Sequence, residues 1–318
     1  MKPSKRNVIL ALSVIMPALV TAGIGWFCIY RLGQYGVTLF VATPVLLGFL
    51  STATLRFAGP QRFAMCAAIA CLSGFTLSLA FLVLGWEGVV CMVMAVPLAG
   101  TVIVVGAAAG YLAFHRASLN AASTAGTMLL LVLFSAVAES RIHRIAPSFV
   151  RADSMIVNAS SSEVWNTILR TENLPTPDDW FLKTGVACPR SARITRPGVG
   201  GQRVCTLSTG EYVEAIEVWE PERRIRWRAL SNPPPLKEVN PLHAEVSAPH
   251  LHGFYEANFG EIVIDRLGPS SVNVTRRTWY RHNLYPAAYW KQWCDFGASR
   301  VHKFVLREWK SAAERNRA

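Results

Sequence analysis

Five stretches without a charged residue occupy the first 140 positions of the chain, and each is long enough to be a membrane-spanning helix. They cover Asn7 to Tyr30, Leu32 to Leu55, Phe63 to Trp86, Gly88 to Phe114 and Ala117 to Ala138. A helix needs about 20 residues to cross a hydrocarbon core of about 30 Å. The sequence therefore predicts five transmembrane helices joined by short loops, so that neighbours run antiparallel.

Charged residues are concentrated after these stretches. Seven Lys and Arg and two acids precede residue 141, whereas 25 Lys and Arg and 18 acids lie from residue 141 onward. A basic surface suits anionic lipid, an anionic ligand or nucleic acid, but no dense Lys/Arg cluster has nucleic-acid spacing. We therefore expect a transmembrane domain over 1–145, a second domain over 146–318 that lies near the membrane, and no nucleic-acid partner.

The short loops give a weak preference for one orientation. With the N-terminus inside, the inner basic residues are Lys2, Lys5, Arg6, Arg56, Arg62 and Arg116, against Arg31, Arg141, Arg144 and Arg151 outside. Lys and Arg favour the cytoplasmic side. We expect an integral protein of a bacterial inner membrane with its second domain in the periplasm.

Gly106 and Gly110 form a small-xxx-small face in the fourth stretch. Such a face brings two helices into close contact. The partner helix can belong to the same chain or to a second copy, so packing within the chain and a homodimer are both open.

The second half begins with strand and helix signals. A strand is predicted over Ser154 to Val157, and Ser160 with Glu163 has the spacing of a capping box for a helix that ends near Leu169. A short second helix is expected around residues 178 to 183. After it the hydrophobic period changes to two, and the alternation of Arg224, Arg226 and Arg228 with apolar neighbours indicates a sheet that is wet on one face.

The chain ends with a long predicted helix, Pro286 to Ala313. Its aromatic residues gather on one face with Gly297 and Arg300, and Lys291, Asp295, Ser299 and Lys310 lie on the opposite face. Such a stripe needs a partner surface. We expect that surface to be the preceding set of strands.

This order of elements resembles the START-like superfamily, also called SRPBCC or helix-grip, which includes polyketide cyclase/dehydrase-like and lipid-transfer proteins. The resemblance covers about residues 150–314 and is carried by Val157 to Trp165, the glycine turn Pro197 to Gly201, Gly210 to Pro221, Arg224 to Trp227 and the final helix. It implies an α+β fold in which a curved antiparallel sheet wraps the last helix and leaves an apolar cavity.

The resemblance also implies the residues that face this cavity. On the last helix they are Trp293, Gly297, Arg300 and Phe304. Arg300 can pair with a ligand carboxylate or phosphate, or with a sheet acid such as Glu217 or Glu256. Gly297 leaves space where a ligand can approach.

Several strand and loop residues are further candidates for ligand contact. Tyr212, Asn258, Tyr280 and His282 can orient a ligand if strand parity turns them inward, and Trp227 lies on the packed side of its strand. Trp180 and Phe181, with the Pro-rich loop 231–250, either gate the cavity or close the core.

No motif names a reaction. The chain has no nucleophile elbow, no phosphate-binding glycine loop and no paired Cys motif, and the scattered His243, His250 and His252 do not make a metal site. Catalytic residues stay unknown, and we expect no cofactor and no metal.

The interpretation favoured by these patterns is a membrane-tethered START-like domain that binds a hydrophobic small molecule, either a lipid or a polyketide-like compound. One alternative is a cyclase or dehydratase whose inward polar residues do acid-base work. The other is an interaction module whose pocket is filled by its own side chains.

Overall fold

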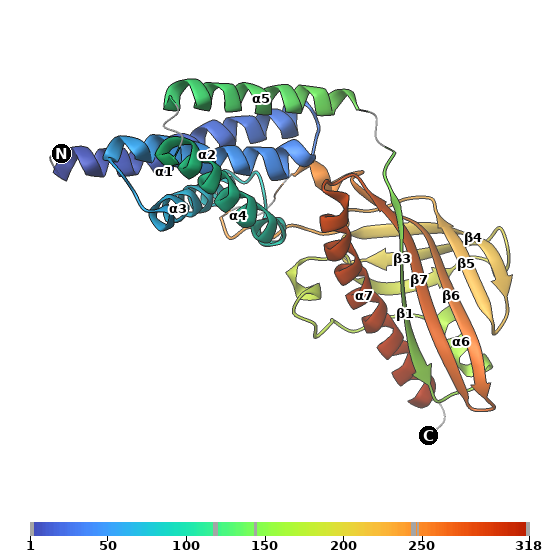
Figure 1. Cartoon of the computed structure of the whole chain (residues 1–318). Coiled ribbons are helices and arrows are strands. Elements are labelled where there is room, and N and C mark those ends of the chain that lie inside the picture. The colour runs from blue at the N-terminus through green and yellow to red at the C-terminus, as the bar shows by residue number, and fades with distance from the viewer. Residues whose placement is uncertain (1–2, 117–119, 143–144, 243–245, 247, 316–318) are drawn as a thin grey trace. The chain divides into compact units, whose positions relative to one another are not determined.

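The computed structural model describes residues 3–116, 120–142, 145–242, 246 and 248–315. The chain forms two compact units, a helical unit and a unit built around a sheet (Figure 1). The helical unit holds residues 1–145, 238–249 and 284–286, and the sheet unit holds the remainder. Two short segments from the second half of the chain thus belong to the helical unit, which the sequence did not predict.

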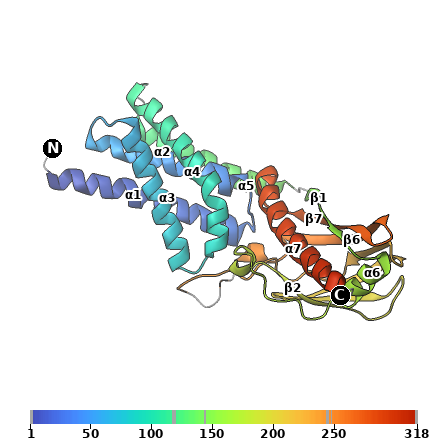
Figure 2. The ribbon, with the colours of Figure 1, turned by 90° about the horizontal axis from the view of Figure 1, so that it is seen from below.

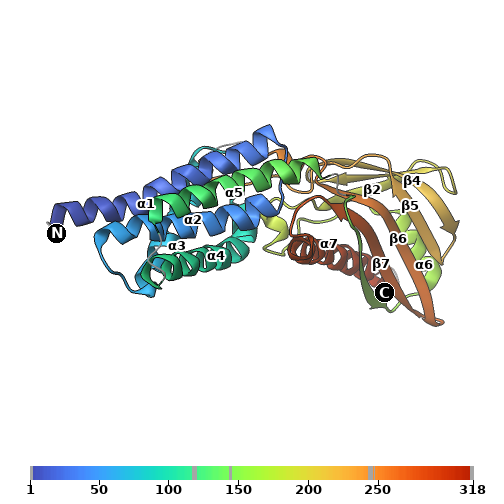
Figure 3. The same cartoon turned by 45° about the horizontal axis from the view of Figure 1, so that its top comes forward.

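The helical unit contains five long helices in its described residues, seen side by side in Figure 3. They are α1 (Pro3–Trp26), α2 (Thr43–Leu55), α3 (Phe63–Val83), α4 (Val89–Tyr111) and α5 (Ala121–Arg141), with π-helical turns at Phe27–Arg31, Thr38–Ala42 and Leu112–Arg116 and a 3-10 turn at Arg56–Ala58. The five candidate spans have mean hydropathies between 1.7 and 2.5. By length and composition all five can cross a membrane.

Glycine residues bring α2 and α4 into backbone contact. A Cβ at Gly106 would lie 2.0 Å from the carbonyl oxygen of Val45, and one at Gly48 would lie 2.0 Å from that of Ile103. A Cβ at Gly110 would lie 3.2 Å from the carbonyl oxygen of Phe49, which also belongs to α2. The face on which a homodimer was considered is therefore covered by α2 of the same chain.

The returning segment at residues 238–240 binds the start of α4. Val89 N–H donates to the Val239 carbonyl over 2.9 Å, and Cys91 N–H donates to Glu238 Oε1 over 3.0 Å. Asn240 Nδ2 donates to the Leu82 carbonyl at the end of α3 over 2.9 Å. The first N–H groups of a helix have no partner within the helix, so this segment satisfies donors that would otherwise be left unpaired.

The sheet unit is a seven-stranded antiparallel sheet with the order β1-β7-β6-β5-β4-β3-β2. Its strands are β1 (Ser148–Val157), β2 (Pro189–Ile194), β3 (Gln202–Leu207), β4 (Gly210–Glu220), β5 (Arg224–Ala229), β6 (Tyr255–Gly268) and β7 (Ser271–His282). Its helices are α6 (Ser161–Leu169) and α7 (Ala287–Arg315), with 3-10 turns at Leu182–Thr184 and Pro249–Leu251. The sheet curls about α7 (Figure 2). The predicted α+β helix-grip arrangement is confirmed.

Two sequence-based element bounds were wrong. The first strand starts at Ser148 instead of Ser154, because the long strand β7 continues to His282 and pairs Arg281 with Ser148. The short helix expected near residue 178 is a 3-10 turn that begins only at Leu182. Asp179 accepts the N–H groups of Phe181 and Leu182 there, which favours a tight turn.

The capping box predicted for α6 is present. Ser160 Oγ accepts the N–H of Glu163 over 3.3 Å, and Glu163 Oε2 accepts the N–H of Ser160 over 2.7 Å. This arrangement satisfies two N–H groups at the helix start. It fixes the entry of the chain into α6, whose Val164 and Trp165 are buried.

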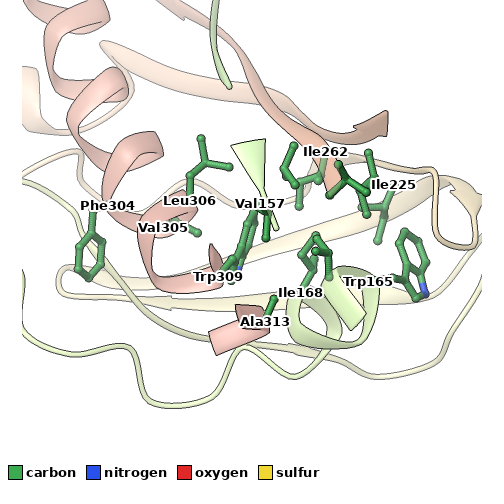
Figure 4. Packing of buried hydrophobic residues seen from close by; sticks show 14 of the residues in the cluster. Val157, Trp165, Ile168, Ile225, Ile262, Phe304, Val305, Leu306, Trp309 and Ala313 are labelled. Carbon is green, nitrogen blue, oxygen red and sulfur yellow. The ribbon is translucent and has the colours of Figure 1, made fainter. Parts of the chain in front are cut away.

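The hydrophobic core lies between the sheet and the C-terminal half of α7 (Figure 4). Phe304, Val305 and Trp309 of α7 are 3%, 2% and 3% exposed. Burying side chains of this size stabilises the fold by about 1.5 to 3 kcal/mol each. The Trp309 indole also donates to Thr171 Oγ1 over 2.9 Å. The space between the sheet and the C-terminal half of α7 is therefore filled by packed side chains.

Candidate functional site

The concave face of the sheet changes from apolar to polar along β7. Val272 and Val274 belong to the core next to α7. Because alternate residues of a strand share a face, Arg276, Thr278 and Tyr280 also point toward the concave side. The part of the concave face that the hydrophobic core does not cover thus carries titratable and hydrogen-bonding groups.

A buried ion pair lies on the same face of β3 and β4. Arg203 and Glu214 are directly opposite each other in the ladder, and their guanidinium and carboxylate are in contact. The Arg203 guanidinium also lies over the Trp227 ring, 4.5 Å from its centroid. Gly260 makes room for that indole, because a Cβ there would lie 2.4 Å from Trp227 Nε1.

A pocket of about 370 Å³ lies where β5 ends and β6 begins. Its lining residues are Leu230, Ser231, Asn232, Pro233, Leu251, His252, Gly253, Tyr255 and Glu256. Tyr255 stacks on Tyr280 with 5.4 Å between ring centroids, and the Tyr280 hydroxyl donates to Asp295 Oδ1 of α7 over 2.6 Å. The pocket wall is thereby joined to the sheet and to the last helix.

Three tyrosines near this pocket stay protonated at neutral pH. Burial is the main cause that raises the pKa of Tyr212, Tyr255 and Tyr280, and neighbouring acids add to it. Their hydroxyls therefore act as hydrogen-bond donors. Tyr212 donates to the carbonyl oxygen of Ala257 over 2.8 Å, across the intervening strand β5.

A hydroxyl, an imidazole and a carboxylate form a chain between the sheet and α7. His302 Nδ1 lies 3.0 Å from Asp153 Oδ2, and His302 Nε2 lies 2.8 Å from Thr278 Oγ1. Burial lowers the pKa of His302 to about 4, against the opposing effect of Asp153. The neutral imidazole donates from Nδ1 because a carboxylate only accepts, so Thr278 donates to Nε2.

Asp153 is the ionised member of this chain. Burial opposes its charge, but hydrogen bonds from His302, Arg151 and Ser299 outweigh that effect and hold its pKa well below the ordinary range. Arg151 Nη2 and Ser299 Oγ lie 2.6 and 2.8 Å from Asp153 Oδ1. Ser299 was placed on the outer face of the helix from the sequence, and so was Asp295. Both in fact point at β1 and β7.

The residues predicted on α7 lie in different surroundings. Arg300 pairs with Asp179, with Nη1 and Oδ2 2.6 Å apart, and its guanidinium lies 4.8 Å from the centroid of Phe296. Phe304 is in the hydrophobic core. Trp293 is half-buried and its ring meets Phe296 edge to face, with centroids 6.3 Å apart.

Glu217 and Glu256, the acids considered as partners for Arg300, bind elsewhere. Glu217 accepts from Arg228 and Glu256 accepts from Arg281. Both pairs are on the outer side of the sheet unit, where their side chains are partly exposed. Arg300 therefore fixes a loop residue to the helix.

The two residues considered as a gate differ in exposure. Trp180 is 66% exposed, whereas Phe181 is 6% exposed and belongs to the hydrophobic core. The Phe181 ring meets Phe296 edge to face at 4.9 Å and lies 3.4 Å from where a Cβ of Gly297 would be. Phe181 thus covers the bare side of α7 at Gly297.

The strand residues that were predicted to contact a ligand also lie in different surroundings. Tyr212, Trp227 and Tyr280 share the concave face through the ladder register. Asn258 is the extra residue of a bulge in β6, and its buried Oδ1 has no hydrogen-bond partner among the described residues. His282 stacks on Phe149 with centroids 5.1 Å apart. His243 lies outside the described residues.

Sequence reasoning missed the most polar members of the concave face. Arg276 and Thr278 were not singled out, although their parity with Val272 and Val274 was visible in the sequence. Asp153 was left outside the first predicted strand, which was expected to begin at Ser154, although it lies within β1. His302 could not have been found, because its two partners lie 24 and 149 residues away along the chain.

No family model and no curated protein matches the chain. The solved structures that resemble the chain do so at low identity. The Zhui aromatase/cyclase from Streptomyces sp. R1128 is 13% identical over 54% of this chain and 97% of its own, with a TM-score of 0.37. A START superfamily protein from Mycobacterium smegmatis is 11% identical over 51% of this chain and 97% of its own, with a TM-score of 0.34. Truncated norcoclaurine synthase from Thalictrum flavum is 14% identical over 52% of this chain and 96% of its own, with a TM-score of 0.32.

Proposed function

We propose that this chain is a membrane-anchored START-like protein that binds a hydrophobic small molecule, a lipid or a polyketide-like compound, between the sheet and α7. The observation that supports it most is the polar part of the concave face. A pocket of about 370 Å³ adjoins this face at Tyr255, and no described residue of α7 lines that pocket. Ligand pockets have volumes of about 300 to 1,000 Å³ and combine apolar walls with a few polar groups. Apolar burial, at about 25 cal/mol per Å², supplies the affinity.

The residues proposed to contact the ligand come from both layers. Tyr212, Trp227 and Tyr280 contribute from the sheet, and Asn258 offers its unpaired Oδ1. Trp293, Gly297, Arg300 and Phe304 contribute from α7, and Trp180 and Phe181 form the movable cover. Displacing Phe181 opens the bare side of Gly297.

The helical unit is proposed to span a bacterial inner membrane, with the sheet unit on the periplasmic side. The support is the length and hydropathy of the five helices and the basic residues of the inner loops. Val199, in a turn of the sheet unit, is 65% exposed. A cysteine introduced there, in a chain whose seven native cysteines are replaced by serine, should react with a membrane-impermeant maleimide in intact spheroplasts. Labelling only after lysis would place the sheet unit in the cytoplasm.

Native mass spectrometry of the full chain, released from detergent or nanodiscs, tests the binding function. A co-purifying apolar molecule at about one copy per chain is expected, and organic extraction identifies its class. Lipid held by the helical unit would co-purify as well, so the full-length variant Gly297→Trp, whose new side chain fills the proposed binding space, is the matched control. A full chain that carries nothing beyond this control would refute the proposed function.

The Thr278–His302–Asp153 chain favours a second candidate, an enzyme that moves a proton on its ligand. Its order of hydroxyl, imidazole and carboxylate is that of a general-base relay. The extracted molecule, returned to purified protein, should then change in mass or absorbance with the native chain and not with His302→Gln. An identical product pattern for both proteins would leave binding as the function.

A further inference from the structure

On the concave face, the guanidinium of Arg276 has no hydrogen-bond or ion-pair partner among the residues that the structure describes. Arg276 lies at the middle of β7, opposite Ile262 of β6 and Asp153 of β1 in the two ladders. Ile262 is in the hydrophobic core, which puts Arg276 on the inner side of the sheet. Its side chain is only partly exposed, and no hydrogen bond or ion pair joins it to another described residue.

The carboxylates around Arg276 already have cations of their own. Glu214 is bound by Arg203, Asp153 by Arg151, and Asp295 by Lys291. Burial is the main cause that lowers the pKa of Arg276, and the nearby charge of Arg203 lowers it further. The Glu214 carboxylate has the opposite effect on this pKa. Among the described residues, the inner face therefore carries a positive charge that no paired carboxylate balances.

An unbalanced charge in this position is unfavourable unless something pairs with it. Removing an ion from water costs several kcal/mol, and an arginine cannot lose its proton to avoid that cost. A guanidinium offers five donors in a planar fork that fits a carboxylate or a phosphate. The hydroxyl of Tyr255, whose pKa is raised mainly by burial, stays protonated and offers a further donor on this face.

We infer that Arg276 binds an anionic head group, a carboxylate or a phosphate, of the apolar molecule held between the sheet and α7. This inference rests on the proposed function and names its substrate class: an amphipathic anion such as a fatty acid or a lysophospholipid. The apolar tail lies along Trp227 and the aromatic residues of α7. Arg300, whose charge is paired with Asp179, has no part in recognising the anion.

Matched acidic and neutral lipids test this assignment. The full chain in amphipol is loaded with the fluorescent probe 11-(dansylamino)undecanoic acid, which is then displaced by oleate, methyl oleate, oleoyl lysophosphatidate or monoolein. A hydrogen bond to a charged group is stronger than a neutral one, so the acidic lipid of a pair should bind about tenfold tighter or more. For each pair, the ratio of the acidic lipid's affinity to the neutral lipid's affinity is determined. The pair with the larger ratio shows whether the head group is a carboxylate or a phosphate.

Variants assign the preference to one residue. Arg276→Met should bring both ratios close to one with little change for the neutral lipids, and Arg276→Lys should keep part of the preference because the charge remains. Arg228→Met is the matched control: Arg228 is an exposed arginine on the outer face, paired with Glu217, and its loss should change neither ratio. Circular dichroism establishes that each variant is folded.

The outcomes separate this inference from the proposed function. Equal affinity for acidic and neutral lipids in the native chain, or a ratio that survives Arg276→Met, would overturn the role of Arg276 and leave hydrophobic binding intact. If none of the four lipids displaces the probe, or the probe itself does not bind, the proposed function and the inference fall together. Should Arg276→Met not fold, the native ratios and Arg276→Lys still decide.

Discussion

The Arg300 guanidinium on α7 binds the Asp179 carboxylate, with 2.6 Å between Nη1 and Oδ2. Asp179 accepts the N–H groups of Phe181 and Leu182 as well, at 2.9 and 3.3 Å. One carboxylate thus joins the last helix to the segment that carries Phe181. The Arg300–Asp179 pair therefore adds a partly exposed polar contact to the packing of Phe181, which belongs to the hydrophobic core.

Arg300→Leu should loosen this segment. The Arg300 side chain is 38% exposed, so solvent screens the pair and the loss of stability should stay near or below about 1 kcal/mol. Amide hydrogen exchange in peptides covering residues 179–184 should quicken, while peptides of β6 and β7 keep their protection. Asp179→Asn serves as the reciprocal variant. Unchanged exchange in both proteins would mean that the pair does not hold the segment.

Gly297 offers two substitutions with opposite effects. Gly297→Ala should stabilise the chain by up to about 1 kcal/mol, because Ala is the better helix former and its Cβ would lie at an ordinary 3.4 Å from Phe181. Gly297→Trp should displace Phe181 and fill the proposed binding space. Thermal denaturation and probe binding measure both effects. Full binding by the Trp variant would contradict a ligand site at this position.

Gly260 should be intolerant of any side chain. A Cβ would lie 2.4 Å from the indole nitrogen of Trp227, and overpacking a buried site costs typically about 1 to 3 kcal/mol. Gly268→Ala, at the end of the same strand, is the matched control, since no atom lies within 4 Å of its Cβ position. Urea denaturation should separate the two variants. Equal midpoints would show that the Trp227 indole shifts freely.

His302 makes stability depend on pH in a defined window. The unfolded chain binds a proton to His302 as the pH falls below about 6.5, whereas the folded chain does so only near its lowered pKa of about 4. The unfolded state therefore binds more protons between these values, and stability falls as the pH is lowered through them. A pKa difference of this size between the unfolded and folded states corresponds to roughly 3 kcal/mol in the free energy of unfolding.

Denaturation midpoints between pH 8 and pH 4.5 measure this dependence. In His302→Gln the decline attributable to this residue should disappear, although the variant starts from a lower stability because Asp153 and Thr278 lose a partner. Parallel curves for the native chain and the variant would exclude His302 as the source.

Local patterns were sufficient to predict most elements of the sheet unit. The capping box at Ser160 and Glu163 and the alternation around Arg226 depend on neighbours within a few residues, so they are visible in the sequence. Charge-free length likewise identified the five helices. The extent of β1 was not visible, because its first residues are extended only through pairing with β7.

The face of α7 was harder to predict because hydropathy assigns polar residues to solvent. Asp295 and Ser299 instead bind Tyr280 and Asp153 on the sheet. The position of Arg276 was predictable in principle from its parity with Val274. Its lack of a partner was not, since that depends on Arg203, Arg151 and Lys291 each occupying a nearby acid.

The central claim is that an apolar molecule lies between the sheet and α7, and covalent capture tests it most directly. Palmitic acid carrying a mid-chain diazirine is irradiated with the full chain, and adducts are mapped by peptide mass spectrometry. We predict adducts on β7 near residues 276–280 and on α7 between 290 and 304, suppressed by excess oleate. Adducts confined to the five long helices, with none in the sheet unit, would contradict the account.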